Sequence, residues 1–340
     1  MKEQIGVIGL GACGSNIANL FENKGYNTLY INTSIEDLNV FKGAHKLHIK
    51  GAEGAAKDRK RVLQLATDTF PDIIQQIESI IAQRYIIVIF SSSGGTGSGL
   101  STPILRYLSQ TGKVCISVMV LPDGDVESAK ANENAYNACA ELMSMQGLGA
   151  TFLLDNSKCD KFAINSKFVN EFDTFINLKN SSMYGNIDIA ERKQMLSCPG
   201  VAMIAKTSKI KSTSADIIYS LHNGIYAEIE QKTAMYLALS TSNKSLDIKS
   251  ITSEFLSLYD QFIGFSEATS LMVVSGLPFP HKRIEKFKNK FEETVKNINN
   301  TIIQQPPTIQ PLPSLSFTRE EFKPTAPVNP RDILLNLLNN

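Results

Sequence analysis

The fold of this chain is decided by the stretch Tyr85-Ile86-Ile87-Val88-Ile89-Phe90-Ser91-Ser92-Ser93-Gly94-Gly95-Thr96-Gly97-Ser98-Gly99. Its first six residues are an unbroken apolar run rich in β-branched side chains, which predicts a strand buried on both faces of a parallel sheet. The glycines and hydroxylated residues that follow predict a loop of exposed backbone N–H groups, which suits the phosphates of a nucleotide. A low-complexity linker is the alternative, but the flanking strand and the helix expected up to Gln110 argue against it.

A second glycine loop stands near the start of the chain, where Gly9-Leu10-Gly11-Ala12-Cys13-Gly14 matches the pattern GxGxxG after an apolar run. Glycines let a ligand approach the backbone closely, and the next helix offers its free N–H groups to phosphate. The same pattern occurs in dinucleotide-binding enzymes and in plain tight turns. A dinucleotide fold, however, should have an acidic residue at the end of the second strand, where this chain has Asn32-Thr33, and it has no use for the loop at 93–99.

Strands and helices alternate along the rest of the chain, which predicts an α/β fold with a doubly wound parallel sheet. Apolar side chains at helical spacing predict one long helix over 161–178 that leaves the first domain. The residues beyond it predict a second, smaller α/β domain. Helices are expected at 56–66, 73–83, 127–145, 215–226, 248–262 and 281–297, and strands at 28–31, 114–120, 151–154, 201–205, 234–239 and 271–275.

We therefore expect four parts: a nucleotide-binding domain over 1–160, a central helix over 161–182, a C-terminal activation domain over 183–300, and a tail over 301–340. The tail begins with a proline-rich polar segment that predicts an extended linker. It ends in an apolar run after Pro330 that predicts a short docking helix. A protein partner would recognise Leu334, Leu335, Leu337 and Leu338; packing of this run on its own globule is the alternative.

The composition excludes several classes of protein. The formal net charge of +1 gives no general electrostatic case for wrapping nucleic acid. The five cysteines are scattered without CxxC spacing, which argues against a disulfide framework and a zinc site, and the four histidines are isolated. No run approaches about 20 apolar residues. We expect a cytoplasmic protein with no direct membrane or nucleic-acid binding and no metal held by side chains alone.

The loop Ser93–Gly99 resembles the signature loop of the tubulin/FtsZ superfamily of GTPases, with serine at its first glycine. Three other loops resemble this family and occur in its order: 11–16, Asn32-Thr33-Ser34, and Gly51-Ala52-Glu53-Gly54. The resemblance covers about residues 3 to 280. The chain length, the segment 275–280 and the tail are most similar to the TubZ branch, which plasmids and phages carry.

The resemblance implies a site for GTP or GDP, with Mg²⁺ held by the nucleotide. Asn16 and Asn165 would contact guanine, and Glu127 would hold ribose hydroxyls. Cellular relatives carry an arginine four residues after this glutamate, where this chain has Ala131. The basic run 57–61 is expected to be a solvated helix face, or a subunit contact. The GTP-binding residues implied are Gly11, Ala12, Cys13, Gly14, Asn16, Asn32, Gly51, Ala52, Glu53, Gly54, Ser93, Gly94, Gly95, Thr96, Gly97, Ser98, Glu127 and Asn165.

The segment Asn186-Ile187-Asp188-Ile189-Ala190-Glu191 is similar to the acidic loop that this family inserts into the nucleotide site of the neighbouring subunit. The resemblance makes Asn186, Asp188 and Glu191 the catalytic residues. Asp188 and Glu191 are three apart, so on a helical turn they share a face and can orient one water. Helix capping by the same carboxylates is the alternative, and the two roles can coexist.

The implied function is a GTPase that polymerises head-to-tail into dynamic filaments, with hydrolysis tied to assembly. Its expected role is segregation or positioning of plasmid or phage DNA through a DNA-binding adaptor. The alternatives are a cell-division polymer like FtsZ, a nucleotide-binding polymer that no longer hydrolyses, and a nicotinamide-dependent oxidoreductase.

Overall fold

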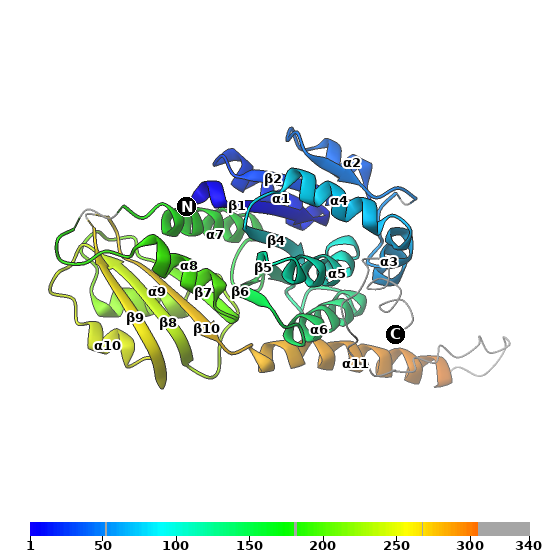
Figure 1. The fold of residues 1–340 in the computed structure, drawn as a ribbon. Helices are drawn as coiled ribbons and strands as arrows, with labels where there is room; N and C mark the ends of the chain where they lie inside the picture. The colour runs from blue at the N-terminus through cyan, green and yellow to red at the C-terminus, as the bar shows by residue number, and fades with distance from the viewer. Residues whose placement is uncertain (52, 180–181, 267, 305–340) are drawn as a thin grey trace.

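The computed structural model describes residues 1–51, 53–179, 182–266 and 268–304. Within them, one ten-stranded sheet has the order β3-β2-β1-β4-β5-β6-β7-β10-β8-β9 (Figure 1). The strands are β1 (Ile5–Leu10), β2 (Asn27–Asn32), β3 (Lys46–His48), β4 (Tyr85–Ser91), β5 (Val114–Leu121), β6 (Leu148–Asp155), β7 (Gly200–Lys206), β8 (Thr233–Thr241), β9 (Ser257–Phe265) and β10 (Leu271–Leu277).

Eleven α-helices surround this sheet in the described residues, after a short 3₁₀ turn at Lys2–Gln4. They are α1 (Gly11–Asn23), α2 (Ile35–Asn39), α3 (Arg59–Thr67), α4 (Phe70–Ile80), α5 (Thr96–Gln110), α6 (Ala129–Met143), α7 (Lys161–Ile176), α8 (Ile189–Ser197), α9 (Ser214–His222), α10 (Ile248–Thr252) and α11 (His281–Gln304). None of the described helices is both long enough and apolar enough to cross a bilayer.

The first half of the sheet is the doubly wound parallel sheet that the sequence predicts. Strands β3 through β7 pair in parallel. All six residues of β1 are buried, as are the first six of β4. The strand order reverses between β1 and β4, and such a sheet leaves a crevice for a ligand at the carboxyl ends of the strands at this reversal. Both glycine loops follow these two strand ends.

The predicted long helix is confirmed as α7, which begins where Asp160 accepts hydrogen bonds from Phe162 N and Ala163 N. Phe168, Phe172 and Phe175 of this helix are buried against the first half of the sheet, whereas Phe162 is exposed. Phe172 packs edge-on against Phe21 of α1 at 5.6 Å between ring centroids, and Phe168 lies 5.3 Å from Phe152 of β6. The helix therefore joins the core of the first half to the loops of the second (Figure 1).

The second half of the sheet is mixed, because β10 is antiparallel to both of its neighbours, β7 and β8. The helix expected over 248–262 is wrong here: α10 ends at Thr252 and residues 257–265 form β9, parallel to β8. Ile251, Phe255 and Phe262 have helical spacing, but the last of them belongs to a half-exposed edge strand. Pairing with β8 overrides the spacing.

Several other helix boundaries differ from the sequence prediction, and for two of them the structure shows the cause. Helix α3 begins at Arg59 and not at residue 56, because Ala56 and Lys57 have left-handed backbones with φ of 46° and 61°. Helix α9 ends at His222 and not at 226, because the segment 225–227 pairs with the end of β6. There Asp155 N donates to Ile225 O at 2.9 Å and Ala227 N to Leu153 O at 3.0 Å.

Helix α11 lies along α6 of the first half, although the sequence assigns residues 183–300 to the second domain (Figure 1). Arg283 of α11 forms a buried ion pair with Asp155 at 2.7 Å, and Lys286 pairs with Asp125 at 2.6 Å. The division into four parts remains a prediction, and its last part from residue 305 lies outside the described residues.

Candidate functional site

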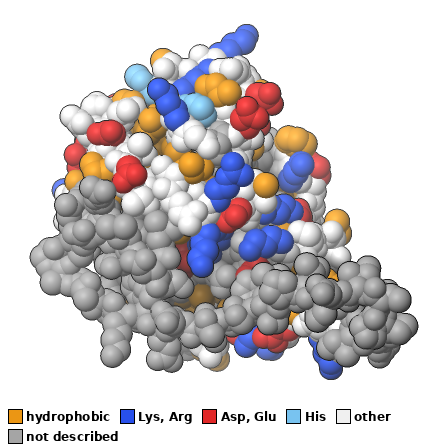
Figure 2. All heavy atoms as spheres, turned by 90° about the vertical axis from the view of Figure 1, so that its right-hand side faces the viewer, with side chains coloured by type: hydrophobic (Ala, Val, Ile, Leu, Met, Phe, Trp, Pro, Cys, Tyr) orange, Lys and Arg blue, Asp and Glu red, His pale blue; other side chains and the backbone are white. Residues whose placement is uncertain are grey.

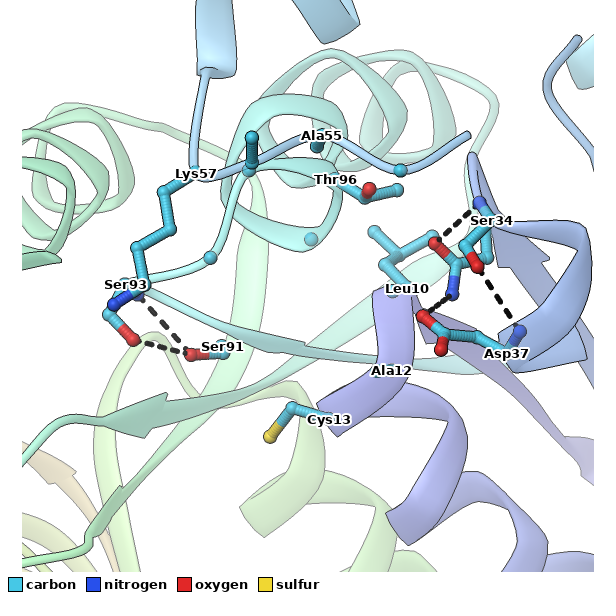
Figure 3. A pocket seen from close by; sticks show the side chains of 17 residues that line it. Leu10, Ala12, Cys13, Ser34, Asp37, Ala55, Lys57, Ser91, Ser93 and Thr96 are labelled. Carbon is cyan, nitrogen blue, oxygen red and sulfur yellow. Dashed lines mark hydrogen bonds between the residues drawn. The ribbon is translucent and has the colours of Figure 1, made fainter. Parts of the chain in front are cut away.

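A cavity of about 270 Å³ opens at the carboxyl ends of β1 and β4, where the strand order reverses. It is enclosed by four loops (Figure 3). Lys57 and Ser93 lie at one side of it, and Ser34 and Asp37 at the other. The lining residues are Leu10, Gly11, Ala12, Cys13, Asn32, Ser34, Asp37, Gly54, Ala55, Ala56, Lys57, Ser91, Ser93, Gly94, Gly95, Thr96 and Gly97.

Two helices point their N-termini into this cavity. Helix α1 begins at Gly11 and α5 at Thr96, and neither N-cap residue, Leu10 or Gly95, accepts a hydrogen bond from the first turn through its side chain. The first N–H groups of a helix have no partner inside the helix, and together with the helix dipole they attract anions. Two such termini on one cavity form a site for a polyanion such as a chain of phosphates.

Close packing of the two loops explains two of their glycines. A Cβ on Gly97 would lie 2.9 Å from the carbonyl oxygen of Leu10, so only glycine lets the loops meet. A Cβ on Gly14 would lie 2.2 Å from the carbonyl oxygen of Ile89. Gly14 therefore permits contact between α1 and β4, and it does not line the cavity.

Asn32 shapes its own turn. Its side-chain oxygen accepts from Thr33 N at 2.8 Å, and its amide donates to Asp37 at 3.0 Å. Thr33 is buried, and its hydroxyl lies 2.7 Å from that of Thr96, which ties this turn to the glycine loop of α5. The turn thereby brings Asp37 to the cavity, a residue that the sequence analysis missed. The spacing of Ser34 and Asp37, a helix N-cap and its third residue, is the signal that marks this turn.

The expected solvated helix face at 57–61 is wrong for two of its basic residues. Lys57 lies before α3, lines the cavity and pairs with Glu127 at 2.9 Å. Arg59 is mostly buried and binds Glu141 at 2.6 Å and the carbonyl of Ser98 at 3.0 Å. Lys60 and Arg61 are exposed, as expected. The role of Lys57 was missed because its partner is distant in sequence.

Most of the GTP-binding residues that the sequence implies meet at the cavity. Cys13 is among them, and burial raises the pKa of its thiol to about 12. Residues 11–13, Asn32, Gly54 and 93–97 line the cavity. Those implied residues that do not line it are Gly14, Asn16, Gly51, Glu53, Ser98, Glu127 and Asn165, and Ala52 lies outside the described residues.

The acidic residues implied for catalysis lie at the start of α8 and do not line the cavity of their own chain. Asp188 accepts from Glu191 N at 2.8 Å, and Glu191 accepts from Asp188 N at 2.7 Å. This reciprocal capping box is the alternative role that the sequence raised. Asn186 closes the preceding turn, donating to Ser182 O at 2.7 Å and accepting from Ser182 N at 3.1 Å.

A buried arginine that the sequence analysis did not single out fixes this acidic segment. Arg192 Nη1 donates to the carbonyl of Ile176, the last residue of α7, at 2.6 Å. Its Nε donates to the carbonyl of Asp188 at 3.1 Å. Burial lowers the pKa of this guanidinium, and the nearby Asp188 and Glu191 raise it. Arg192 thus joins the end of α7 to the start of α8.

No group of three or more histidine, cysteine, aspartate or glutamate side chains is placed to hold a metal ion anywhere in the described chain. Of the described residues that line the cavity, Asp37 is the only carboxylate. The residues present fit an ion that is coordinated mainly by phosphate oxygens, with at most one carboxylate from the protein.

Comparisons with known proteins agree with this geometry. Residues 4–164 match the family model of the "Tubulin/FtsZ family, GTPase domain". The chain is 30% identical to the tubulin-like protein TubZ of the Clostridium botulinum C phage over 303 residues, covering 86% of this chain and 84% of the relative.

Solved structures share the fold. The crystal structure of TubZ from Clostridium botulinum phage c-st matches with a TM-score of 0.80 at 27% identity, over 87% of this chain and 100% of that one. A GTPγS-form protofilament of Bacillus thuringiensis serovar israelensis TubZ matches with a TM-score of 0.71 at 17% identity, over 90% of this chain and 95% of that one.

Proposed function

The chain belongs to the tubulin/FtsZ family, and on that premise we propose that it is a GTP-hydrolysing cytoskeletal protein that polymerises head-to-tail into filaments. The observation that carries the proposal is the convergence of two uncapped helix N-termini, those of α1 and α5, on one cavity at the strand reversal. Phosphates of GTP bind to these backbone N–H groups.

Different residues of the site bind the phosphates, the ribose and the base of the nucleotide. The loops 11–13 and 93–97 hold the phosphates, Gly54 and its neighbours lie beside the terminal phosphate, and Glu127 at the rim holds ribose hydroxyls. Asn16 and Asn165 contact the base. Mg²⁺ would be held mainly by the nucleotide, with Asp37 as the one described carboxylate that lines the cavity, and it would neutralise part of the triphosphate charge.

Catalysis uses the acidic segment of a neighbouring subunit. Asn186, Asp188 and Glu191 lie outside the cavity of their own chain, and the side chains around them are exposed: Met183 by 92%, Tyr184 by 63% and Ile189 by 47%. Exposed apolar side chains next to polar ones are typical of a subunit contact. Asp188 and Glu191 then orient the attacking water against the next subunit's nucleotide, since phosphoryl transfer needs a positioned nucleophile more than a strong base.

This contact is heterologous, because the acidic segment of one subunit meets the cavity of the next, so it propagates into a filament. Hydrolysis is therefore stimulated by assembly. Loss of the terminal phosphate removes contacts to loop 51–54, loosens the interface and gives turnover of the filament.

The cargo is plasmid or phage DNA, held through a DNA-binding adaptor that recognises the apolar end of the tail, and the protein acts in the cytoplasm. On the described part of the face in Figure 2, basic and acidic side chains are interspersed. A surface of mixed sign favours a protein adaptor over direct binding of DNA.

A mixing experiment tests the shared site. Phosphate release from GTP and light scattering are recorded across protein concentrations for wild type, Glu191→Gln and Gly94→Asp. A Cβ on Gly94 meets nothing within 4 Å, so aspartate fits there and repels the phosphates. Wild-type activity per molecule should rise above a threshold concentration. Each variant alone should hydrolyse little, and an equal mixture should regain activity where an intact cavity meets an intact acidic segment.

The same measurements can contradict the proposal of a shared active site. If activity per wild-type molecule is independent of concentration and the mixed variants do not rescue each other, the site is complete within one chain and the filament proposal fails.

A further inference from the structure

We propose that Lys57 is the phosphate-binding cation of this site, a role that rests on the proposed binding of GTP in the cavity. The ligand class is a nucleoside di- or triphosphate. Lys57 comes from the loop between β3 and α3, which the sequence analysis treated as the start of a solvated helix.

The charge of the cavity requires such a residue. Two helix N-termini supply roughly +0.5 charge each, which offsets only part of the charge of a triphosphate. Of the described side chains that line the cavity, Lys57 is the only cation, and Asp37 across the cavity is an anion (Figure 3). The remaining lining residues are uncharged. Without Lys57, Asp37 would be the only charged side chain among the described lining residues, and it would offset the attraction of the two helix N-termini for a polyanion.

The present contacts of Lys57 leave it available to a ligand. Its ammonium nitrogen lies 2.9 Å from Glu127 Oε2 and 3.4 Å from Ser128 Oγ. Both side chains of the ion pair are 41% exposed, so water screens the pair and it contributes little to stability. The ammonium can therefore turn from Glu127 to a phosphate by changing rotamer, while Glu127 accepts from ribose hydroxyls.

The backbone of Lys57 is held in an unfavourable conformation beside the phosphate loop. Both Ala56 and Lys57 have a positive backbone φ, which residues other than glycine, asparagine and aspartate seldom adopt. Such strain persists where the surroundings enforce it, and it is concentrated at functional sites. Here Asn134 of α6 donates to the carbonyl of Lys57 at 2.8 Å and also to that of Ser93 at 3.2 Å. One side chain thus fixes the lysine and the glycine loop together.

The chain has no room for a cation at the position where cellular relatives carry their arginine. That position is Ala131, in the first turn of α6, and it is fully buried. The cation that reaches Glu127 comes instead from another loop. The nearby ion pair of Arg59 and Glu141 does not line the cavity, and a structural role is enough to explain it. Lys57 does line the cavity and is partly exposed, so a structural role alone does not explain its position.

Calorimetric titration of the full-length protein with GTP and with GMP tests the proposal. Lys57→Met should weaken GTP binding about tenfold or more, as expected for loss of a hydrogen bond to a charged group, while GMP binding changes much less. Lys57→Arg should retain most of the GTP affinity. The matched control is Lys60→Met, which removes the same charge from an exposed site on α3 and should change neither affinity.

A second variant distinguishes direct binding of phosphate by Lys57 from an indirect effect of Lys57 through its ion pair with Glu127. Glu127→Gln should weaken GTP and GMP by similar factors, because it acts at the ribose. If Glu127→Gln reproduces the selective loss of GTP, or if Lys57→Met weakens both nucleotides equally or neither, Lys57 is not a phosphate ligand. Wild-type protein that binds neither nucleotide would overturn the proposed function itself.

Discussion

The nucleotide cavity and the acidic segment at α8 differ in whether the polar groups at their helix N-termini have side-chain partners within the chain. At the cavity, the N-termini of α1 and α5 have no side-chain cap. At α8, Asp188 and Glu191 cap each other's backbone, and Arg192 binds the carbonyl groups of Ile176 and Asp188. One region is incomplete without an anion, whereas the other is rigid and self-contained. A rigid carboxylate pair presented to a neighbour's open anion site is what a shared active site requires.

The largest effect is expected when the negative charge of Asp188 is removed while its N-cap hydrogen bond to α8 is kept. Asparagine is as good an N-cap as aspartate, so Asp188→Asn should leave the fold and the filaments intact. GTP hydrolysis should fall by about 100-fold or more, the range expected for a residue that positions a proton or a water. Phosphate release and sedimentation measure the two effects. Hydrolysis at the wild-type rate would mean that Asp188 only caps the helix.

The long helix that connects the two regions carries a buried carboxylate whose charge is unfavourable. Burial raises the pKa of Glu171 from 4.5 to about 7, although Lys167 and Lys206 oppose the shift. The folded state therefore binds a proton more tightly than the unfolded state, and stability falls as pH rises from about 4.5 through 7. Above pH 7, Glu171→Gln should be more stable than wild type by up to about 3 kcal/mol.

Urea unfolding at pH 5 and pH 8 measures this difference. Glu133→Gln, which removes a carboxylate from the α6 surface pair with Lys130, is the control and should show no such dependence. Equal stability of Glu171→Gln and wild type at both pH values would contradict the assignment.

The rigidity of the acidic segment can be tested through Arg192. Arg192→Met keeps the apolar stem but leaves the buried carbonyl of Ile176 without this donor, which should cost about 1–3 kcal/mol in the free energy of unfolding. Hydrolysis should fall while GTP affinity stays unchanged, because the cavity lies elsewhere. Urea unfolding and titration with GTP give the two values, with Lys193→Met as the neighbouring control. A matching loss of GTP affinity would show that the two regions are coupled within one chain.

The smallest effect is expected at the contact between the two cavity loops. Thr33→Val preserves the shape of the side chain and removes the buried hydroxyl contact with Thr96. The loss should be about 1 kcal/mol, seen as a few-fold weaker binding of GTP with no change in the α8 region. Titration with GTP measures it, and Thr69→Val at the exposed N-cap position of α4 is the control. An unchanged affinity would mean that the loops hold their positions without this bond.

Local chemistry explains why much of this fold could be predicted from the sequence. The buried run of β4, the glycines after it and the phenylalanines of α7 each carry their signal within a few residues. Strand β9 was mistaken for helix because Ile251, Phe255 and Phe262 share a helical spacing, and only pairing with β8 decides otherwise. The sequence had no local signal for that pairing.

Contacts between distant residues explain what the sequence could not predict at the site. Lys57 meets Glu127 seventy positions away, and Arg192 acts on the carbonyl of Ile176, whose place depends on the path of the chain between α7 and α8. Arg283 of α11 and Asp155 at the end of β6, which hold α11 against the first half, are 128 positions apart. Each of these contacts follows from the assembled sheet and not from any local pattern.

The pairing of β6 with β7 has a mechanical consequence. These strands share only the pairs from Ala150 with Gly200 to Phe152 with Ala202, and beyond them the segment 225–227 takes the place beside β6. If subunits join as we propose, tension along a filament enters each subunit at the cavity and leaves at α8, which contacts β5 and β6 of the first half as well as β10 of the second. The contacts of α8 with both halves, and those of α7 with α1 and β7, would then carry this load together with the short β6–β7 pairing.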